Sequence, residues 1–514
     1  MQPAAFPHAV THLLLKETHI SWLVLTGRYA YKFKKPVHYD FLDASTLERR
    51  RYLCEEELRL NLRLAPDLYV DVQPVTAENG NMRLGGDGRI VEYAVRMHEF
   101  EASQELSSQL ERGTVTPEDM AGLAVLIAEF HRRAAIARLE SEYGTHETVE
   151  SEILGNLTTL LQHLIDGESS KAIARLGAWS KRALAVLAPL IADRKHSGAV
   201  RECHGDLHAR NIVRWQQRWL PFDCIEFEPK LRWIDVMSDV AFLFMDLVAR
   251  SRPDLAHAFL SRYLEQSGDY EGLGVLRLYA AYRALVRAKV DTLGAENSAV
   301  ETARSLRARV AGRVNVAARL IDPQQPVLMI MHGVTASGKS WLSERLVSAI
   351  NALRVRSDIE RKRIADLASL ERTSAGVGEG IYAAESSLRT YERLLRCGQF
   401  GLRAGFNMIV DATFLGAAER GRFRQLAIEQ RCNFLIISCH ASRSVLDARI
   451  EARARTGLDP SEATLPVLEH QLATQQALTP QEQPHAVLVD TSSPTSAEAG
   501  IEEVRSRSAA TPQP

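Results

Sequence analysis

Residues 333–340 read Gly333-Val334-Thr335-Ala336-Ser337-Gly338-Lys339-Ser340 and fit the pattern G-x-x-x-x-G-K-[ST] at every fixed position. The apolar run Val327–Met331 precedes them, and Trp341–Val347 has the composition of a helix. A strand, a glycine-rich loop and a helix in this order let backbone N–H groups surround phosphate oxygens at a helix N-terminus. We therefore expect residues 333–340 to bind ATP, with Lys339 at the β/γ-phosphates and the Ser340 hydroxyl on Mg²⁺.

The composition is that of an ordinary globular protein. The 514-residue chain has 46% hydrophobic and 25% charged residues, and this length suits about three domain-sized units. The formal net charge of −1 disfavours nucleic acid as a partner, because nucleic-acid-binding proteins concentrate positive charge. Six scattered cysteines without a C-x-x-C pair indicate reduced thiols and a cytoplasmic location. Neither a signal peptide nor a membrane-spanning run is evident, so no membrane partner is expected.

The region before residue 100 predicts a small sheet with one helix. Thr18–Thr26 and Tyr29–Lys35 flank a Gly27-Arg28 turn, which predicts a hairpin. Lys32 and Lys34 share one face of its second strand, because side chains alternate with a period of two. The other predicted elements are a charged helix over Leu47–Leu64, which carries Glu55, Glu56 and Glu57, and strands over Leu68–Val75 and Arg89–Met97.

Helical patterns dominate from about residue 104 to residue 320. Thr116-Pro117-Glu118-Asp119 is a helix start, with a capping hydroxyl and acids near the positive end. Further helices are predicted over Ile153–Ile165, Trp179–Ile191, Val236–Ala249 and Leu273–Lys289. An arginine-rich helix over residues 301–320 presents either a solvated face or an electrostatic surface for nucleic acid or the other domain.

The clearest domain boundary is Ile321–Pro326, whose two prolines predict a stiff joint. The sequence therefore predicts a first domain over residues 1–322, with a small lobe over residues 10–100 and a helical lobe over residues 101–322. A second domain is predicted over residues 323–490. Residues 491–514 are rich in Ser, Ala, Pro and Thr, which predicts a disordered tail.

A second chemical motif lies at His204-Gly205-Asp206-Leu207-His208-Ala209-Arg210-Asn211, and Asp223 follows beyond a short hairpin. A phosphoryl-transfer site needs an Asp that accepts the proton of the substrate hydroxyl, and an Asn and a second Asp that hold Mg²⁺. Asp206, Asn211 and Asp223 have this order and spacing. The alternatives are a metal site at His204 and His208, or an ordinary polar loop.

These residues resemble the catalytic loop and metal-binding Asp of the aminoglycoside phosphotransferase and choline kinase-like family, over most of residues 10–300. The resemblance implies an α+β, two-lobed, protein-kinase-like fold, with Asp206 as the base and Asn211 and Asp223 on Mg²⁺. It also implies that Lys32 or Lys34 contacts nucleotide phosphates beside a helix Glu. Glu57 is preferred for that role, with Glu55 and Glu56 as alternatives.

Two further segments of the first domain follow from the same resemblance. Asp235 and Asp239 are expected to brace the catalytic loop, and Met97–Phe100 is expected to form the hinge that bonds adenine. The chain lacks the G-x-G-x-x-G that covers the phosphates in protein kinases. This departure leaves open a first domain that senses nucleotide without strong catalysis.

The second domain, over about residues 327–490, resembles small P-loop kinases related to polynucleotide kinase, zeta-type toxins and adenylylsulfate kinase. The resemblance implies that Asp358 approaches the acceptor hydroxyl and that Arg361 contacts substrate; the alternative for Asp358 is a helix N-cap. Asp411, at the end of a predicted strand over Asn407–Asp411, is expected to assist Mg²⁺. Arg449 and Arg453, four residues apart, are expected to form a lid over the transferred phosphoryl group, or else a solvated helix face.

Together the two halves resemble a bacterial two-domain family in which a phosphotransferase-like domain precedes an α/β P-loop domain with a parallel sheet. The expected function is a tandem kinase that uses ATP and Mg²⁺ to phosphorylate a small-molecule hydroxyl. One alternative is a single active kinase whose other domain is a nucleotide-dependent regulator. The other is a nucleic-acid end kinase, which the neutral net charge disfavours.

Overall fold

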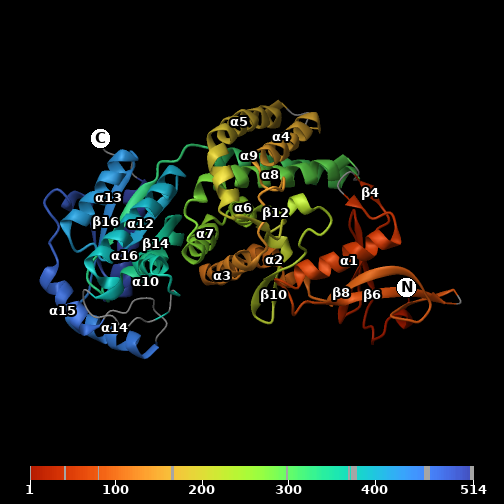
Figure 1. Cartoon of the computed structure of the whole chain (residues 1–514), viewed down its shortest axis with the longest axis horizontal. Helices are drawn as coiled ribbons and strands as arrows, with labels where there is room; N and C mark the ends of the chain where they lie inside the picture. The colour runs from red at the N-terminus through yellow and green to blue at the C-terminus, as the bar shows by residue number, and fades with distance from the viewer. Residues whose placement is uncertain are drawn as a thin grey trace.

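The computed structural model describes residues 2–39, 42–78, 80–163, 167–296, 299–368, 371, 379–456 and 464–509, with the side chains of residues 453 and 454 excepted. Figure 1 shows three bodies in a row: an N-terminal sheet, a helical body, and a second sheet with helices on both faces. The first two bodies make up the two-lobed domain that the sequence predicts, and the third is the predicted α/β domain. None of the described helices is both long and apolar enough to cross a membrane.

The N-terminal sheet is antiparallel, with the described strands in the order β1-β2-β3-β8-β6-β7. Their bounds are β1 Leu14–Glu17, β2 Ser21–Leu25, β3 Tyr29–Lys34, β6 Tyr69–Glu78, β7 Asn81–Leu84 and β8 Arg89–His98, with a short pair β4 His38–Tyr39 and β5 Leu42–Asp43 beside them. Helix α1 (Leu47–Asn61) packs on β8 and β6 and begins where the Thr46 side chain accepts a hydrogen bond from the Arg49 N–H. The predicted hairpin and helix are therefore confirmed.

The helical body follows. Its helices are α2 Leu106–Glu111, α3 Pro117–Arg133, α4 His146–His163, α5 Gly167–His196, α6 Val236–Ala249, α7 Pro253–Ser267, α8 Leu273–Glu296 and α9 Val300–Leu320. The segment between α5 and α6 contains two short pairs of antiparallel strands: β9 Val200–Glu202 with β12 Trp233–Asp235, and β10 Ile212–Trp215 with β11 Arg218–Pro221. The predicted start of α3 is confirmed, because the Thr116 side chain accepts from Asp119 N–H. The sequence interpretation missed α7.

The C-terminal sheet is parallel, with the described strands in the order β14-β15-β13-β16-β17. Its strands are β13 Val327–His332, β14 Ala352–Arg356, β15 Asn407–Asp411, β16 Asn433–His440 and β17 Ala486–Asp490. Its helices are α10 Lys339–Ala349, α11 Ser357–Ile364, α12 Ala384–Arg403, α13 Ala417–Glu429, α14 Arg443–Thr456, α15 Leu465–Thr474 and α16 Pro494–Ala509. Every residue of β13 is buried, as expected for a strand covered on both faces.

The expectation of a disordered tail over residues 491–514 is wrong for most of that segment. Residues 494–509 form α16, which packs on β17 and α10. Ala497, Gly500 and Val504 are buried on its inner face. The Ser, Ala and Thr content that suggested disorder instead lets this helix approach the sheet closely: a Cβ at Gly500 would lie 2.7 Å from a methyl of Val489. Residues 510–514 lie outside the described residues.

The two halves meet where α7 packs on the edge strand β14, as Figure 1 shows. Arg354 of β14 donates from Nε to Glu265 Oε1 of α7 at 2.6 Å, and both side chains are buried. The Ser261 hydroxyl accepts from Arg354 N at 3.0 Å, and the Tyr270 hydroxyl donates to Arg354 O at 2.8 Å. These neutral and charged hydrogen bonds therefore cover the β14 edge of the parallel sheet with α7.

Candidate active sites

A buried cluster of charges joins the small lobe to the helical body. Lys32 donates to Glu57 Oε1 at 2.9 Å and to Asp223 Oδ1 at 2.5 Å. Lys34 donates to Glu57 Oε2 at 2.5 Å and also bonds to Glu226. Burial opposes ionisation of Glu57, but the two lysines hold its pKa at about 2. Both lysines thus contact Glu57, and Lys32 is the one that also reaches the predicted metal-binding Asp.

The other two acids of α1 face elsewhere. Glu55 is half-exposed and pairs with Arg51, whereas Glu56 pairs with Arg59 and Arg232. Of the three glutamates, the structure therefore brings only Glu57 to Lys32 and Lys34.

Asp206 lies in the loop between β9 and the short helical turn Ala209–Asn211. Its carboxylate accepts a hydrogen bond from Asn211 Nδ2 at 3.0 Å and lies 3.3 Å from His208 Nε2. Burial opposes ionisation, but His208, Arg287 and His204 hold the pKa of Asp206 below its usual range. The carboxylate is therefore ionised at neutral pH and can accept a proton, which is what a base requires.

Asn211 and Asp223 lie at the open end of the β10–β11 hairpin, whose register pairs Ile212 with Pro221. Asn211 O accepts from Phe222 N at 2.9 Å, so the backbones touch there. The Asn211 amide nitrogen faces Asp206, which leaves Oδ1 as its ligand-capable atom. Asp223 adopts a left-handed backbone with φ of 65°. An amide and a carboxylate oxygen are donors of the type that Mg²⁺ takes, so these residues fit the ion.

The loop that carries Asp206 is braced by Asp239, as expected, whereas Asp235 contacts other parts of the chain. Asp239 accepts hydrogen bonds from His204 N and Gly205 N, each at 3.0 Å, and from the His131 ring at 3.2 Å. Asp235 caps α6 and accepts a bidentate pair from Arg194. Both acids are buried. The bonds of Asp239 fix the backbone that leads into Asp206, whereas those of Asp235 hold the start of α6 and Arg194.

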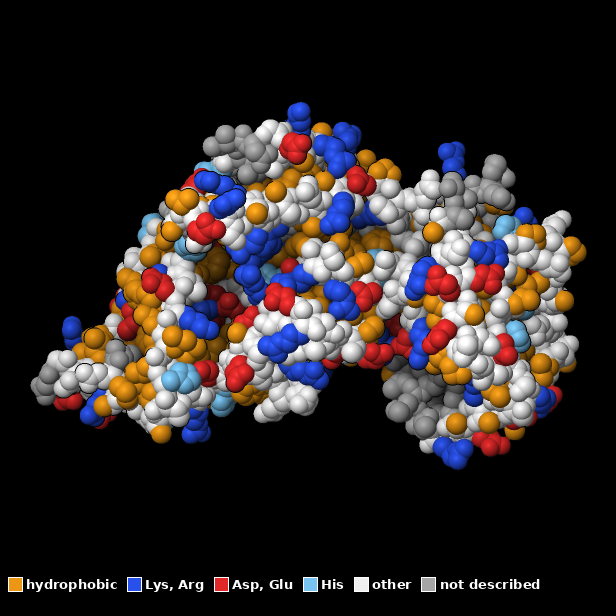
Figure 2. Space-filling view, turned by 180° about the vertical axis from the view of Figure 1, so that it is seen from behind, with side chains coloured by type: hydrophobic (Ala, Val, Ile, Leu, Met, Phe, Trp, Pro, Cys, Tyr) orange, Lys and Arg blue, Asp and Glu red, His pale blue; other side chains and the backbone are white. Residues whose placement is uncertain are grey.

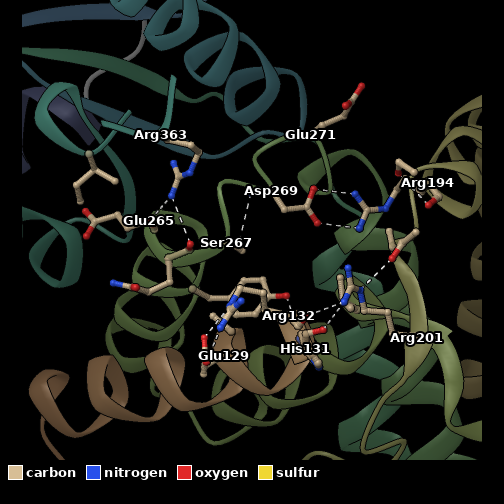
Figure 3. Close-up of a pocket in the computed structure, with 18 of the residues that line it drawn as sticks. Glu129, His131, Arg132, Arg194, Arg201, Glu265, Ser267, Asp269, Glu271 and Arg363 are labelled. Carbon is tan, nitrogen blue, oxygen red and sulfur yellow. Dashed lines mark hydrogen bonds and ion pairs between the residues drawn. The ribbon is translucent and has the colours of Figure 1, made fainter. Parts of the chain in front are cut away.

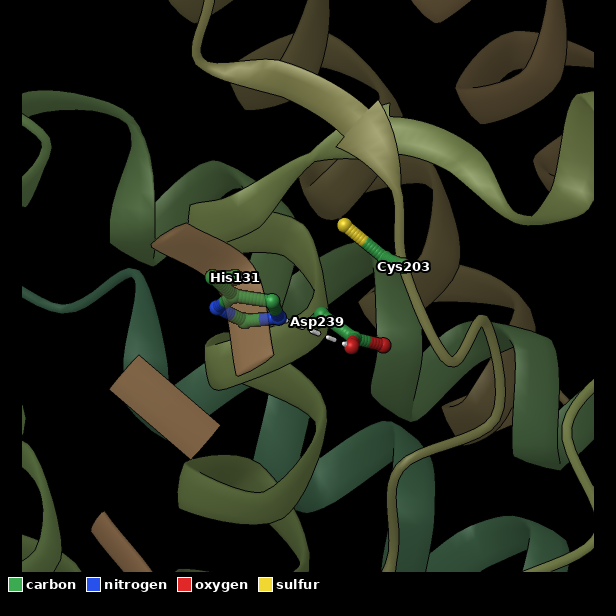
Figure 4. A group of neighbouring side chains, drawn as sticks. All are labelled: His131, Cys203 and Asp239. Carbon is green, nitrogen blue, oxygen red and sulfur yellow. Dashed lines mark hydrogen bonds and ion pairs between the residues drawn. The ribbon is translucent and has the colours of Figure 1, made fainter. Parts of the chain in front are cut away.

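His131, Cys203 and Asp239 form a group whose ligand atoms lie within 4.8 Å of one another (Figure 4). His131 bonds through Nδ1 to the Tyr263 hydroxyl and through Nε2 to Asp239. Burial raises the pKa of the Cys203 thiol well above its usual range, and its Sγ donates to Ile234 O at 3.5 Å. The group is therefore a hydrogen-bonded brace rather than a metal site.

Replacing Asp239 with Asn should destabilise the chain. The amide has no charge and keeps only one of the two oxygens that accept from His204 N and Gly205 N. The free energy of unfolding should therefore fall by about 1.5–3 kcal/mol, the usual contribution of hydrogen bonds to a charged group. Urea unfolding of the full chain measures the change. Asp67→Asn is the matched control, because Asp67 is exposed and surface changes of this kind stay within about 0.5 kcal/mol. Equal unfolding midpoints for the two variants would contradict the bracing role.

In the second half, the loop over residues 333–340 joins β13 to α10 at the carboxyl edge of the sheet. Gly333 and Gly338 have φ of 136° and 84°, and a Cβ at Gly338 would lie 2.7 Å from the Thr491 hydroxyl. Lys339 Nζ donates to Val334 O at 2.7 Å, and Thr335 N donates to Gln471 Oε1 at 2.6 Å. The loop therefore curls around its own lysine, and a phosphate oxygen bound at Thr335 N would replace the Gln471 oxygen.

Asp411 ends β15 directly beside β13, and its carboxylate accepts from the Ser343 hydroxyl at 3.0 Å. Ser343 lies on α10, one turn after Ser340. Both Asp411 and Ser340 thus lie where the strands of a parallel sheet end, which is the binding edge of such folds. A hydroxyl and a carboxylate oxygen fit Mg²⁺ at this edge.

The predicted substrate residues are placed as follows. Asp358 is the second residue of α11, which directly follows β14, so the N-cap alternative is wrong: Arg356 occupies the cap position. Arg361 donates to Ile381 O and the Ser387 hydroxyl, at the start of α12. Arg449 donates to Ala336 O at 3.1 Å and to Thr491, so it contacts the loop that it is expected to cover. The side chain of Arg453 lies outside the described residues.

Three contacts of this site were not predicted from the sequence: those of Thr491, Gln471 and Arg354. Thr491 follows β17, and its hydroxyl donates to Ser337 O. Arg354 Nη1 donates to Ser340 O at 3.1 Å and to the Ser343 hydroxyl at 3.2 Å. A signal for Arg354 was available, because an arginine inside a buried strand requires partners. Nothing in the sequence marks Gln471.

A cleft of about 1100 Å³ lies between the two halves, with α11 on one side and α3 and α7 on the other (Figure 3). Arg194 bonds to Asp235 and Asp269, and Arg201 donates to three backbone carbonyls of residues 131–134. Arg363 donates to Glu265 O. Of these three arginines, Arg363 bonds across the two halves, whereas Arg194 and Arg201 bond within the first half. The residues that line the cleft include neither the Lys32 cluster nor the loop over residues 333–340, so the cleft is distinct from both candidate sites.

Comparison with known proteins shows similarity over most of the chain. A family model described as an AAA domain matches residues 328–478. An uncharacterized protein of Mycobacterium bovis and two of Mycobacterium tuberculosis are each 30% identical over 440 residues, which is 86% of this chain and 86% of each relative. A match of this length spans both halves.

Solved structures align with each half separately. A choline/ethanolamine kinase family protein from Mesorhizobium loti covers 62% of this chain and 92% of its own, at 12% identity and a TM-score of 0.38. A gluconokinase from Sinorhizobium meliloti covers 36% of this chain and 96% of its own, at 20% identity and a TM-score of 0.26.

Proposed function

The chain belongs to the same family as these mycobacterial proteins, and on that premise we propose that it is a tandem kinase that uses ATP and Mg²⁺ to phosphorylate a small-molecule hydroxyl. In this proposal a choline kinase-like domain precedes the P-loop domain. We assign residues 1–322 to the first domain and residues 323–509 to the second. The second boundary includes α16, because that helix packs on the last strand of the sheet.

One observation carries the proposal: each half assembles phosphate-binding and acidic groups from distant parts of the chain. In the first half, Lys32, Glu57 and Asp223 come from a strand, a helix and a loop and meet within hydrogen-bond distance. In the second half, the Gly333–Ser340 loop and Asp411 share one sheet edge. Binding alone would not require an ionised Asp206 held in place beside the first cluster.

In the first domain, Lys32 is assigned to the nucleotide phosphates, with Glu57 holding its ammonium group in position. Asn211 and Asp223 would hold Mg²⁺, which neutralises negative charge on the phosphates when bound. Asp206 accepts the proton of the acceptor hydroxyl as that oxygen bonds to the γ-phosphorus. The bond to the β–γ bridging oxygen breaks in the same step, so ADP is the leaving group.

In the second domain, the backbone N–H groups of residues 333–340 and the ammonium of Lys339 are assigned to the phosphates. Ser340 and Asp411 would hold Mg²⁺ at this edge. Asp358 is assigned to the acceptor hydroxyl, and Arg449, with Arg453, to the charge of the transferred group. The bonds of Arg449 to Ala336 O and Thr491 keep its guanidinium at the loop.

A second candidate function is one active kinase regulated by nucleotide at the other domain. The buried Glu265–Arg354 pair favours it, because Arg354 also donates to Ser340 O, next to Lys339. A nucleic-acid end kinase has weaker support, because Arg309 and Arg313 of the arginine-rich helix both pair with Asp291.

Nucleotide stoichiometry tests the proposal. We expect the full chain to bind two molecules of a non-hydrolysable ATP analogue in the presence of Mg²⁺, measured by equilibrium dialysis. Lys339→Ala and Lys32→Met should each reduce this number to one, since each removes the ammonium that meets the phosphates in one domain. Mg-ATP turnover over a panel of small alcohols then assigns transfer to each domain.

Circular dichroism of both variants controls for folding. The proposal of a tandem kinase would be contradicted if the wild type bound one nucleotide per chain, or if Lys339→Ala still bound two. Two binding sites with turnover that disappears in only one variant would favour the regulated kinase.

A further inference from the structure

Arginines of α8 and α9 lie near the loop that carries Asp206. Arg283 of α8 donates from Nη1 to Gly205 O at 3.2 Å and from Nε to the Ser238 hydroxyl. Gly205 directly precedes Asp206, so this face of α8 lies against the catalytic loop. Arg287 and Asp291 follow Arg283 at intervals of four residues and therefore lie on the same helix face.

Arg287 differs from its neighbours in its bonding. It is half-buried, and within the described parts of the chain it makes no hydrogen bond and no ion pair. Its charge reaches Asp206 and Asp246, since it is among the groups that lower the pKa of both carboxyls against the effect of burial. A partly desolvated guanidinium with unused donors is suited to an anionic ligand.

Two arginines of α9 bond to α8 on the helix face that carries Arg287. Asp291 accepts from Arg309 at 2.9 Å and from Arg313 at 2.6 Å, so two guanidinium groups share one carboxylate. Burial lowers the pKa of Arg313; the Asp291 carboxylate opposes this effect, and the nearby charge of Arg287 adds to it. Asp246 is already engaged by Ala209 N and Arg250. Figure 2 shows Lys and Arg side chains gathered beside a hollow in the larger part of the molecule.

We propose that Arg287 and Arg313 bind an anionic group of the acceptor, so that the substrate of the first domain is an alcohol carrying a phosphate or carboxylate. The inference rests on the proposed function, because it treats Asp206 as the base for that alcohol. An anion between the two arginines relieves their mutual repulsion. It also fixes the acceptor relative to Asp206, since Arg287 lies one helical turn from the residue that holds Gly205.

Anion binding is tested without turnover. All variants carry Lys339→Ala, so that any anion binding at the loop of the second domain is weakened equally in each of them. The full chain is titrated calorimetrically with inorganic phosphate and separately with malonate. Arg287→Met should weaken binding of at least one anion by about tenfold to a hundredfold, the effect of losing hydrogen bonds to a charged group. Arg287→Lys should retain part of the affinity. The anion that responds more strongly identifies the phosphate or the carboxylate class.

Arg307→Met is the matched control, because Arg307 is exposed on α9 and the charge change is the same. It should alter either dissociation constant by less than about twofold, as expected for a screened surface charge. Unchanged binding of both anions in Arg287→Met would overturn the inference. Failure of the first domain to bind Mg-ATP would instead overturn the proposed function, so the two failures are distinguishable.

Discussion

Asp206→Asn is expected to lower phosphoryl transfer by the first domain by about 10²–10⁴-fold, the usual contribution of a general base. The substitution nearly preserves shape, and the amide oxygen of Asn can still accept the Asn211 Nδ2 hydrogen bond. Folding and nucleotide affinity should therefore change little, while the ability to take the hydroxyl proton disappears. The measurement is single-turnover transfer from Mg-ATP in a Lys339→Ala background, which reports on the first domain alone.

Asp246→Asn is the matched control for Asp206→Asn. Asp246 is partly buried near the same loop and bonds to Ala209 N and Arg250, but it is not assigned to the reacting atoms. Its loss should cost stability and at most about tenfold in rate, as a loop-positioning residue would. Because His208 and Arg287 hold the pKa of Asp206 below its usual range, the rate should stay constant as pH falls to about 4, the ordinary pKa of Asp. A rate for Asp206→Asn equal to that of Asp246→Asn would exclude Asp206 as the base.

The sequence located the main chemical groups because their local patterns are strict. The sequence of the strand, glycine loop and helix around Gly333–Ser340 is compatible with few other local structures, and the parallel sheet forms as predicted. Period-two alternation likewise placed Lys32 and Lys34 on one face. It could not choose between them, and the structure shows why: Glu57 Oε1 contacts Lys32, and Glu57 Oε2 contacts Lys34.

Other features depend on tertiary contacts that no local pattern encodes. Consecutive helix residues point about 100° apart, so which of Glu55, Glu56 and Glu57 faces the sheet depends on how α1 docks. The position of Asp358 depends on where β14 ends and α11 begins. The N-cap of α11 is Arg356, two residues before the Asp358 of the cap interpretation. Helix α7 and its contact with β14 join segments about ninety residues apart, as the Glu265–Arg354 bond illustrates.

Arg354→Met should destabilise the chain by about 3 kcal/mol. Removing one partner of a buried ion pair leaves the other charge without compensation, at about 3–5 kcal/mol. The lower end applies because Glu265 keeps a second contact, with Arg262 at 3.1 Å. Burial opposes ionisation of Glu265, yet Arg354 helps hold its pKa below the usual range. The stabilisation is thus complete above the unfolded pKa of about 4.3 and is lost as pH falls below it.

A double-mutant cycle in urea unfolding at pH 7 separates this pair from its neighbours. Glu265→Gln alone should also destabilise the chain, because it leaves the buried Arg354 guanidinium facing a neutral amide. The double variant should lose at least about 1 kcal/mol less than the sum of the single variants, because the second change removes the uncompensated charge. Arg443→Met, which breaks an exposed pair with Asp447, should cost less than about 1 kcal/mol. Additive losses would mean that Glu265 and Arg354 act independently, and the interface would then depend on its backbone hydrogen bonds, such as those of Ser261 and Tyr270, and on the packing of α7 against β14.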